Sequence, residues 1–258
     1  VPCLSEIQDF KIMKILVCIS KVPDTTAKIS FVENDTKFNE DKVQFIINPY
    51  DEWYALVRAL EIKETIGGTV TVINVGKADN EQVIRKALAL GADEAVRVDA
   101  DPLDALHVAQ NIADYAGKNG FDLIFTGKET IDYNGGVVGG LLAAYLDLPY
   151  ISFVSKLNVD GNRITAERSI EGVIENVEAV TPCVISAQKG LAEARIPNMR
   201  GIVASKTKPL QVINALNTDR NIDYVRFQLP PEKGGCKMIS ADTPEQLIEL
   251  LHNEAKVF

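Results

Sequence analysis

Histidine and cysteine are scarce in this chain of 258 residues, with two and four copies. The two histidines, His107 and His252, form no HxxxH pair, which argues against histidine-based metal catalysis. The cysteines are widely scattered and include no CxxC pair, so they indicate neither a zinc site nor a disulfide framework. They are Cys3, Cys18, Cys183 and Cys236. A reducing compartment is the simplest interpretation, and we expect a cytoplasmic location.

Long apolar runs and an excess of basic residues are also missing. Polar residues interrupt every apolar stretch before the roughly 20 residues that a bilayer requires, so no membrane-spanning segment is predicted. The chain has 27 Lys and Arg against 36 Asp and Glu, and a net charge of −9 argues against a nucleic-acid partner. Residues 1–12 lack the basic start and continuous apolar core of a secretory signal, and we interpret them as an extension.

What remains has the composition of an ordinary soluble globular protein, with 46% hydrophobic and 24% charged residues. Short apolar runs alternate with segments of helical period, which predicts a parallel α/β sheet with right-handed crossovers. Asn48 or Asp51 is expected to cap the first helix, and Asp101 with Pro102 to start the third. The predicted strands are 15–19, 69–75, 95–98 and 123–126, and the predicted helices are 51–62, 81–90 and 103–116, with a fourth from residue 135.

The stretch from residue 122 to residue 150 combines a buried strand, a polar loop and a helix. The loop starts at Gly127 and is expected at the carboxyl end of its strand, where the free N–H groups of the next helix suit a phosphate. The segment matches neither GxGxxG nor GxxxxGK[ST]. Two interpretations stay open for its glycines: close approach of an anion, or tight packing of the helix on the sheet. These glycines are Gly135, Gly136, Gly139 and Gly140.

The rhythm changes after Pro149. A turn at Asp160 and Gly161 predicts a hairpin, and residues 177–187 predict one further strand with Pro182 at an irregular point. The segment that follows has no steady period and contains an exposed-looking Met199. The remaining expectations are a hairpin at the sheet margin within 31–47, an aperiodic arm at 214–235 and a final helix at 244–252.

Five separated stretches together resemble the β subunit of electron transfer flavoproteins, the small subunit of an αβ heterodimer. They are MKILVCISKVPD, INPYDEWYALVRALEIKE, VIRKALALGADEAVRV, GKETIDYNGGVVGGLLAAYLDLPY and TPCVISAQKGLAEARIPNMRGIVASKTKPL, in the family's order and spacing. The resemblance implies a Rossmann-like, adenine-nucleotide-hydrolase-like α/β domain of strand order 3-2-1-4-5 at residues 13–188. It further implies a recognition loop with a following strand at 189–213 and a partner-wrapping arm at 214–258.

The resemblance also implies that this subunit holds one structural AMP, while a redox-active FAD lies mainly on the α subunit. Simpler roles compete at several positions: Cys18 as a small buried residue, Asn48 and Asp51 as helix caps, Tyr50 in core packing and Asp132 as a turn former. The residues implied around the nucleotide are Cys18, Asn48, Pro49, Tyr50, Asp51, Val75, Gly127, Asp132, Asn134, Gly135, Gly136, Val137 and Val138.

Residues 191–200 resemble the loop by which this family docks dehydrogenases through one aliphatic side chain. Met199 falls at the anchor position, where a flexible thioether suits several partners; the alternative is that it packs on its own arm. The partner-recognition residues are Leu191, Ile196, Pro197, Met199 and Arg200. The implied donors are acyl-CoA or related dehydrogenases, and the implied acceptor is a membrane quinone oxidoreductase.

The sequence shows no nucleophile–base pair, so we interpret the chain as a carrier subunit and not as an enzyme. One alternative is an electron-bifurcating relative in which a second FAD replaces AMP. Such relatives carry DGDTAQVG in the loop, of which Val138 and Gly139 remain here, and AMP is therefore favoured. A second alternative is an adenine-nucleotide hydrolase, but SKVPDTT is not the expected SGGxDS loop. A third is a stress-type ATP-binding module, which leaves the arm unexplained.

Overall fold

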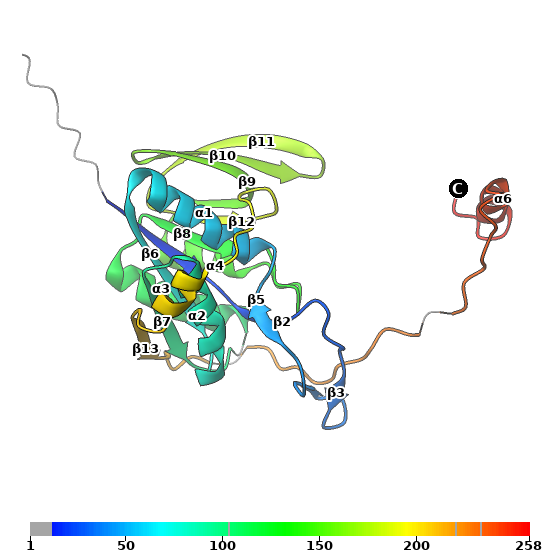
Figure 1. The fold of residues 1–258 in the computed structure, drawn as a ribbon, viewed down its shortest axis with the longest axis horizontal. Helices are drawn as coiled ribbons and strands as arrows, with labels where there is room; N and C mark the ends of the chain where they lie inside the picture. Colours follow the sequence, from blue (N-terminus) through cyan, green and yellow to red (C-terminus); the bar gives the residue numbers. More distant parts are fainter. Residues whose placement is uncertain (1–11, 103, 220, 233) are drawn as a thin grey trace, which may run out of the picture. The chain divides into compact units, whose positions relative to one another are not determined.

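The computed structural model describes residues 12–102, 104–219, 221–232 and 234–258 (Figure 1). The chain divides into two compact units. The main unit comprises Val1–Ile29 and Asn39–Tyr224, and the small unit comprises Ser30–Phe38 and Val225–Phe258. The predicted extension at residues 1–12 lies outside the described residues, apart from Ile12.

A nine-stranded sheet forms the centre of the main unit, in the order β11-β10-β9-β12-β8-β1-β6-β7-β13. The five strands β7-β6-β1-β8-β12 are parallel and follow the 3-2-1-4-5 order, which confirms the predicted α/β fold. The strand bounds are β1 Met13–Cys18, β6 Gly68–Val75, β7 Glu94–Asp99, β8 Leu123–Gly127, β9 Tyr150–Asp160, β10 Arg163–Ile170, β11 Val173–Val180, β12 Cys183–Ala187 and β13 Leu210–Asn214.

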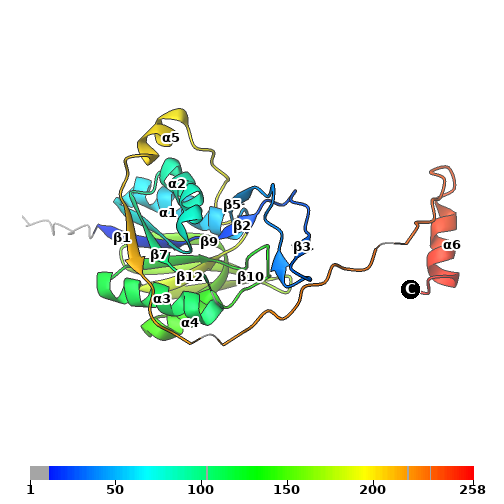
Figure 2. The same cartoon turned by 90° about the horizontal axis from the view of Figure 1, so that it is seen from below.

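Helices cover both faces of this sheet, as Figure 2 shows. Strand β1 shows why both faces are covered, because it has apolar side chains on both sides of the sheet. Ile15 and Val17 pack in the cluster formed with α1 and α2, whereas Leu16 and Cys18 pack in the cluster formed with α3 and α4. The helices are α1 Asp51–Ile66, α2 Glu81–Leu90, α3 Ala105–Asn119 and α4 Val138–Leu146, and a short 3-10 turn, η1 Ala78–Asn80, precedes α2.

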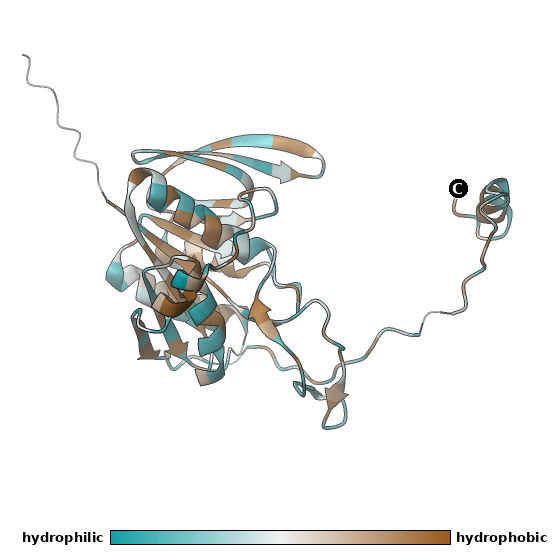
Figure 3. Cartoon of the chain, viewed as in Figure 1, coloured by the Kyte–Doolittle hydropathy of each residue, from teal (hydrophilic) through white to brown (hydrophobic). Residues whose placement is uncertain are grey.

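The hydropathy colouring agrees with this layering, since the central strands are mostly apolar and the helix surfaces are mixed (Figure 3). Among the described residues, no helix has both the length and the apolarity that a membrane crossing requires.

The helix boundaries were predicted better than the helix caps. Gly91 follows the end of α2, as expected, with a φ of 139°. The start signal for α3 was wrong, because Asp104 is its N-cap and accepts a hydrogen bond from the His107 N–H at 2.8 Å. The cap prediction for α1 was also wrong, because its N-cap is Tyr50 and no side chain caps it. Asn48 and Asp51 bind elsewhere, as described below.

The predicted single strand at residues 177–187 was wrong, because two strands occupy this region. β11 pairs antiparallel with β10 and ends before Pro182, and β12 begins after it and returns to the parallel part of the sheet. Proline has no N–H to donate to a strand ladder, which explains the break. The predicted hairpin around Asp160 and Gly161 is confirmed as β9 and β10.

The hairpin expected within residues 31–47 is divided between two small sheets. β2 Lys21–Pro23 pairs with β5 Phe45–Ile47 in the main unit, and β3 Phe31–Val32 pairs with β4 Lys37–Phe38 in the small unit. Neither sheet joins the nine-stranded one.

The small unit has little core of its own. The Phe31 ring stacks on the Phe227 ring at 4.9 Å between centroids, and the Phe227 N–H donates to the Asp35 carbonyl at 2.7 Å. The final helix, α6 Glu245–Asn253, lies close to its predicted position but contains no buried residue. Leu247 and Ile248 are among its exposed apolar side chains.

The segment after β12 stays with the main unit. It forms a short helix, α5 Met199–Ser205, and then β13, which pairs in parallel with β7 at the edge of the large sheet. The structure therefore places residues 210–214 in the same sheet as the domain that was predicted to end at residue 188.

Candidate functional site

Three neighbouring strands end at one edge of the sheet. β8 ends at Gly127, β1 at Cys18 and β6 at Val75, and all three are parallel. The chain leaves β1 toward α1 on one face and leaves β8 toward α4 on the other face. This is the topological switch point at which parallel α/β sheets bind their ligands. We call this edge, with the start of α1 and the loop 128–137, the rim.

Asn48 joins the two loops of the rim. Its side chain is fully buried, and its Nδ2 donates to the Glu129 carbonyl at 2.8 Å while its Oδ1 accepts from the Ile131 N–H at 3.2 Å. Asp51 Oδ2 accepts from the Glu129 N–H at 3.1 Å. These bonds replace the predicted capping role, and they fix the first residues of the loop against the start of α1.

Glu52 is a buried carboxyl group that the sequence interpretation missed. It accepts hydrogen bonds from the Ser20 N–H at 2.6 Å and from the Ser20 hydroxyl at 2.8 Å. Burial raises its pKa to about 8, and the nearby Asp132 and Asp51 add to the rise against the opposing effect of the Ser20 bonds. Glu52 therefore holds a proton at neutral pH in the folded chain. Its position directly after Asp51 in the INPYDEWY stretch was the available signal.

Burial also changes the other ionisable groups of the rim. It raises the pKa of Asp51, and it raises the pKa of the Cys18 thiol well above its usual range. Cys18 is thus a neutral thiol in the cluster under α3 and α4, as the simpler interpretation predicted.

The two interpretations of the rim glycines apply to different residues. A Cβ atom on Gly127 would lie 2.8 Å from Glu52 Cγ, and one on Gly139 would lie 2.7 Å from the Thr126 hydroxyl oxygen, so both glycines serve packing. A Cβ atom on Gly135 would meet nothing closer than 3.7 Å. Of the glycines with two open interpretations, packing explains Gly139, and Gly135 remains open to a ligand; Gly127 was not among them, and packing explains it too.

Among the described residues, no side chain caps the N-terminus of α4. Its N-cap, Val137, makes no side-chain cap hydrogen bond, and the first N–H groups of a helix lack intrahelical acceptors. The loop before it, residues 132–137, is exposed. At the end of β8, the Thr126 hydroxyl is buried and has no hydrogen-bond partner among the described residues. An anion at this place would meet backbone donors and the positive end of the helix dipole.

The remaining predicted rim residues lie at or near the surface. Pro49 is half-buried, and Tyr50 is 52% exposed, so the expected core packing of Tyr50 was wrong. Asp132 is exposed, and its Oδ1 accepts from the Tyr133 N–H at 2.8 Å, which fits its role as a turn former. The exposed Asn134 adopts a φ of 52° in the same turn. The Tyr133 ring packs against Tyr224, with 5.1 Å between centroids.

The predicted recognition segment divides into buried and exposed residues. Leu191 is only 5% exposed and belongs to the core cluster, so its side chain is not available to a partner in this structure. Ile196 is 90% exposed and Met199 is 74% exposed, whereas Pro197 is half-buried. The exposure of Met199 excludes packing on its own arm, and Met199 is the first residue of α5 instead of a loop residue. Arg200 is exposed on the same helix.

Sheet, switch point and rim together define an α/β protein of the class that binds small ligands at the carboxyl edge of a parallel sheet. A family model described as electron transfer flavoprotein domain matches residues 35–217. The chain therefore belongs to the electron transfer flavoprotein family, and its relatives in that family are β subunits. The β subunits of this family are electron-transfer proteins and not classical enzymes.

The relatives carry the same family name. The chain is 36% identical over 259 residues to the electron transfer flavoprotein subunit beta of Bacillus subtilis, covering 95% of this chain and all of that protein. It is 34% identical to the subunit beta of Thermoanaerobacterium thermosaccharolyticum, over 90% and 88% of the two chains. It is 29% identical to the human subunit beta, over 95% and 99%.

Proposed function

We propose that this chain is the β subunit of a heterodimeric electron transfer flavoprotein, which holds AMP at the rim and docks a dehydrogenase with its exposed residues near α5. In this assembly an α subunit carries FAD, and electrons pass through that flavin to a quinone oxidoreductase. The AMP is structural and supplies a fixed phosphate, while the flavin supplies the redox chemistry.

The observation that carries the AMP proposal is the combination of a pinned loop with an uncapped helix start. Asn48 and Asp51 hold the beginning of the loop in place, so the exposed part starts from a fixed position before any ligand arrives. Val137 leaves the N-terminus of α4 without a side-chain cap. A site that is organised in advance loses little entropy on binding.

The residues of the rim fit the parts of an adenylate. Backbone N–H groups at Gly135, Gly136, Val137 and Val138 would face the phosphate, with the open space at Gly135 allowing close approach. Cys18 and Val75, at neighbouring strand ends, would line the adenine slot. Asp51 would accept a hydrogen bond from the ribose or the adenine amine.

Two exposed apolar surfaces support an α-subunit partner. One lies on the edge strand β11, where Val173, Ile174 and Val180 are exposed. The other lies on α6, where Leu247 and Ile248 are exposed and nothing is buried. Exposed apolar surface of this kind marks protein–protein contact sites.

The dehydrogenase contact would centre on Ile196 and Met199. Met199 was predicted as the anchor, and Ile196, which was also predicted as a recognition residue, is the more exposed of the two. Acyl-CoA or related dehydrogenases are the proposed electron donors. An aliphatic side chain that projects from a fixed segment suits insertion into an apolar pocket of a partner.

Co-expression with the α subunit, followed by denaturation and mass spectrometry of the released nucleotides, tests the proposal. We expect one AMP and one FAD per heterodimer. Two FAD and no AMP would instead indicate the bifurcating type, and no adenine compound beyond a single FAD would refute a nucleotide at the rim. ATP turnover by the lone chain would favour the hydrolase or stress-protein alternatives.

A matched pair of variants adds a test of position. Val137→Asp places a carboxylate at the start of α4 and should lower AMP retention several-fold, because the added charge repels a phosphate. Val137→Asn has nearly the shape of Val137→Asp and a similar capping ability but no charge, so it should retain more AMP than Val137→Asp. Equal retention in both variants would place the phosphate elsewhere.

A further inference from the structure

The segment between β12 and α5 is held firmly at both ends. On the N-terminal side, Leu191 is inserted into the core. On the C-terminal side, Asn198 Oδ1 accepts from the Gly201 N–H at 2.8 Å, and Gly201 lies so close to α2 that a Cβ atom would clash with the Ala89 carbonyl. Residues 192–198 between these points contain no helix or strand. Their position therefore depends on contacts made inside the segment.

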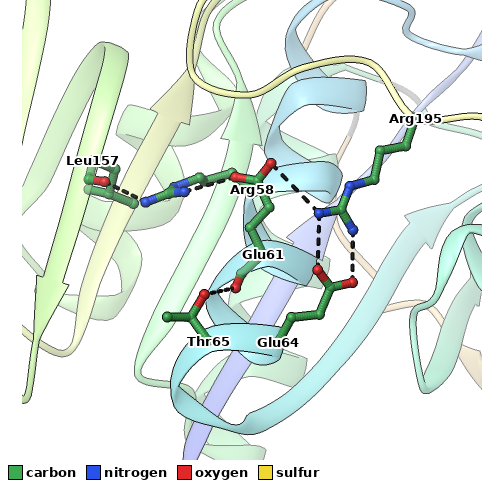
Figure 4. Close-up of polar contacts among 6 residues, drawn as sticks. All are labelled: Arg58, Glu61, Glu64, Thr65, Leu157 and Arg195. Carbon is green, nitrogen blue, oxygen red and sulfur yellow. Dashed lines mark hydrogen bonds and ion pairs between the residues drawn. The ribbon is translucent and has the colours of Figure 1, made fainter.

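Arg195 makes the polar contact at the middle of the segment. Figure 4 shows its guanidinium group turned onto α1, where Nη1 and Nη2 donate to the two carboxylate oxygens of Glu64 at 2.8 Å and 3.0 Å. Glu61, one turn earlier on the same helix, lies 3.8 Å from Nη2. A bidentate pair fixes both the distance and the orientation of the arginine.

The acceptors on α1 are themselves held in place. Arg58 donates to Glu61 Oε2 at 2.8 Å and to the Leu157 carbonyl of β9 at 2.6 Å, and Figure 4 shows this chain of contacts. The Glu64 bond raises the pKa of Arg195, and the Arg195 bond lowers the pKa of Glu64, so both groups are charged at neutral pH.

The residue directly after Arg195 is Ile196, whose side chain is 90% exposed. An apolar side chain with so few contacts of its own can keep one position only if the neighbouring backbone is fixed. We propose that Arg195 is a positioning residue: its ion pair with Glu64 fixes the backbone that presents Ile196 and Met199, and thereby sets the affinity for the docked dehydrogenase. This inference rests on the docking role proposed above.

The expected effect is moderate and specific. Arg195 and Glu64 are partly exposed, and such pairs contribute little to global stability. Loss of the pair should instead mobilise the segment, so that the partner must order it on binding. We expect the KM of the dehydrogenase for the carrier to rise about two- to fivefold with an unchanged kcat.

The experiment uses the complete heterodimer with both cofactors, reduced by an acyl-CoA dehydrogenase and its acyl-CoA substrate. The variants are Arg195→Ala, Glu64→Ala and the charge exchange Arg195→Glu with Glu64→Arg. Arg195→Ala should raise KM more than Glu64→Ala, because Arg195 still has Glu61 nearby when Glu64 is removed. The exchange should restore part of the affinity, because Glu61 repels a glutamate at position 195. Lys118→Ala removes a paired, exposed charge from α3 and should leave KM unchanged. Hydrogen exchange of the amides at 192–198 in the free heterodimer should increase in the single variants only.

The outcomes separate this inference from the proposed function. A wild-type heterodimer that the dehydrogenase does not reduce would contradict the proposed donor. Reduction with an unchanged KM in Arg195→Ala would overturn the positioning role. A higher KM without faster amide exchange, or one that the charge exchange does not restore, would also overturn it, because Arg195 would then contact the partner directly.

Discussion

Different side-chain contacts hold the rim and the recognition segment in place. At the rim, Asn48 and Glu52 are buried and bind backbone or hydroxyl groups, so buried hydrogen bonds fix the loops. In the recognition segment, Arg195 fixes the chain through charges that remain in contact with water, and Ile196 next to it is almost fully exposed. The comparison indicates that a site for a permanently held ligand is organised by buried hydrogen bonds. A site for a transient partner is organised from the surface.

The largest effect is expected at Asn48. Asn48→Ala removes both side-chain bonds of a buried residue and leaves the half-buried Glu129 carbonyl and Ile131 N–H without this partner, which should lower the free energy of unfolding by about 1–3 kcal/mol. Urea unfolding measures this change. Asn119→Ala, at an exposed asparagine of α3, is the control and should change stability by less than about 0.5 kcal/mol. Equal losses in both variants would remove the distinction between the buried rim and the surface.

A pH-dependent effect is expected at Glu52. Its pKa is raised to about 8 from an ordinary value of 4.5, so between these pH values the folded chain keeps a proton that the unfolded chain releases. Stability should therefore fall as pH rises through this window, by at most about 1.4 kcal/mol per pH unit. Urea midpoints between pH 5 and pH 8 should show a steeper decline for the wild type than for Glu52→Gln, which cannot ionise.

Glu193→Gln, at an exposed carboxylate, serves as the control and should keep the wild-type slope. If Glu52→Gln and Glu193→Gln give the same pH profile, Glu52 is ionised in the folded chain. The rim would then contain a buried negative charge, and the contrast with the charged recognition segment would be lost.

The smallest effect on the stability of the fold is expected for the exposed aliphatic residues, whose truncation should affect docking alone. Ile196→Ala and Met199→Ala should leave the unfolding free energy within about 0.5 kcal/mol of the wild type. Truncation of the true anchor should raise the KM of an acyl-CoA dehydrogenase for the heterodimer roughly tenfold. Ile202→Ala, an exposed residue of α5, is the matched control. If neither Ile196→Ala nor Met199→Ala changes KM, docking does not use this segment.

Much of the fold could be predicted because its signals are local. The apolar strands and the helical periods along residues 13–146 indicated the parallel sheet, and Gly91 marked the end of a helix. The strand at 177–187 was misinterpreted because apolar residues continue on both sides of Pro182, and periodicity does not show which neighbour each half pairs with.

The site was predicted less completely because its contacts are distant in sequence. Asn48 looked like a helix cap, yet it binds residues 81 and 83 positions further along the chain. Leu191 was predicted as a contact residue because residues 191–200 resemble the family's recognition loop, yet its apolar side chain enters the core. Glu52 stood beside a predicted residue, but a sequence does not show that a carboxyl group is buried. Burial and long-range hydrogen bonds require the folded backbone.

The exposure of helix α6 affects how readily proteases degrade the chain in the cell. A helix with no buried residue gains no stability from tertiary packing and unfolds readily, which makes it accessible to proteases. In the proposed heterodimer the α subunit would cover it, so only assembled chains would be protected. Degradation of unassembled chains would then remove any surplus of this subunit over its partner.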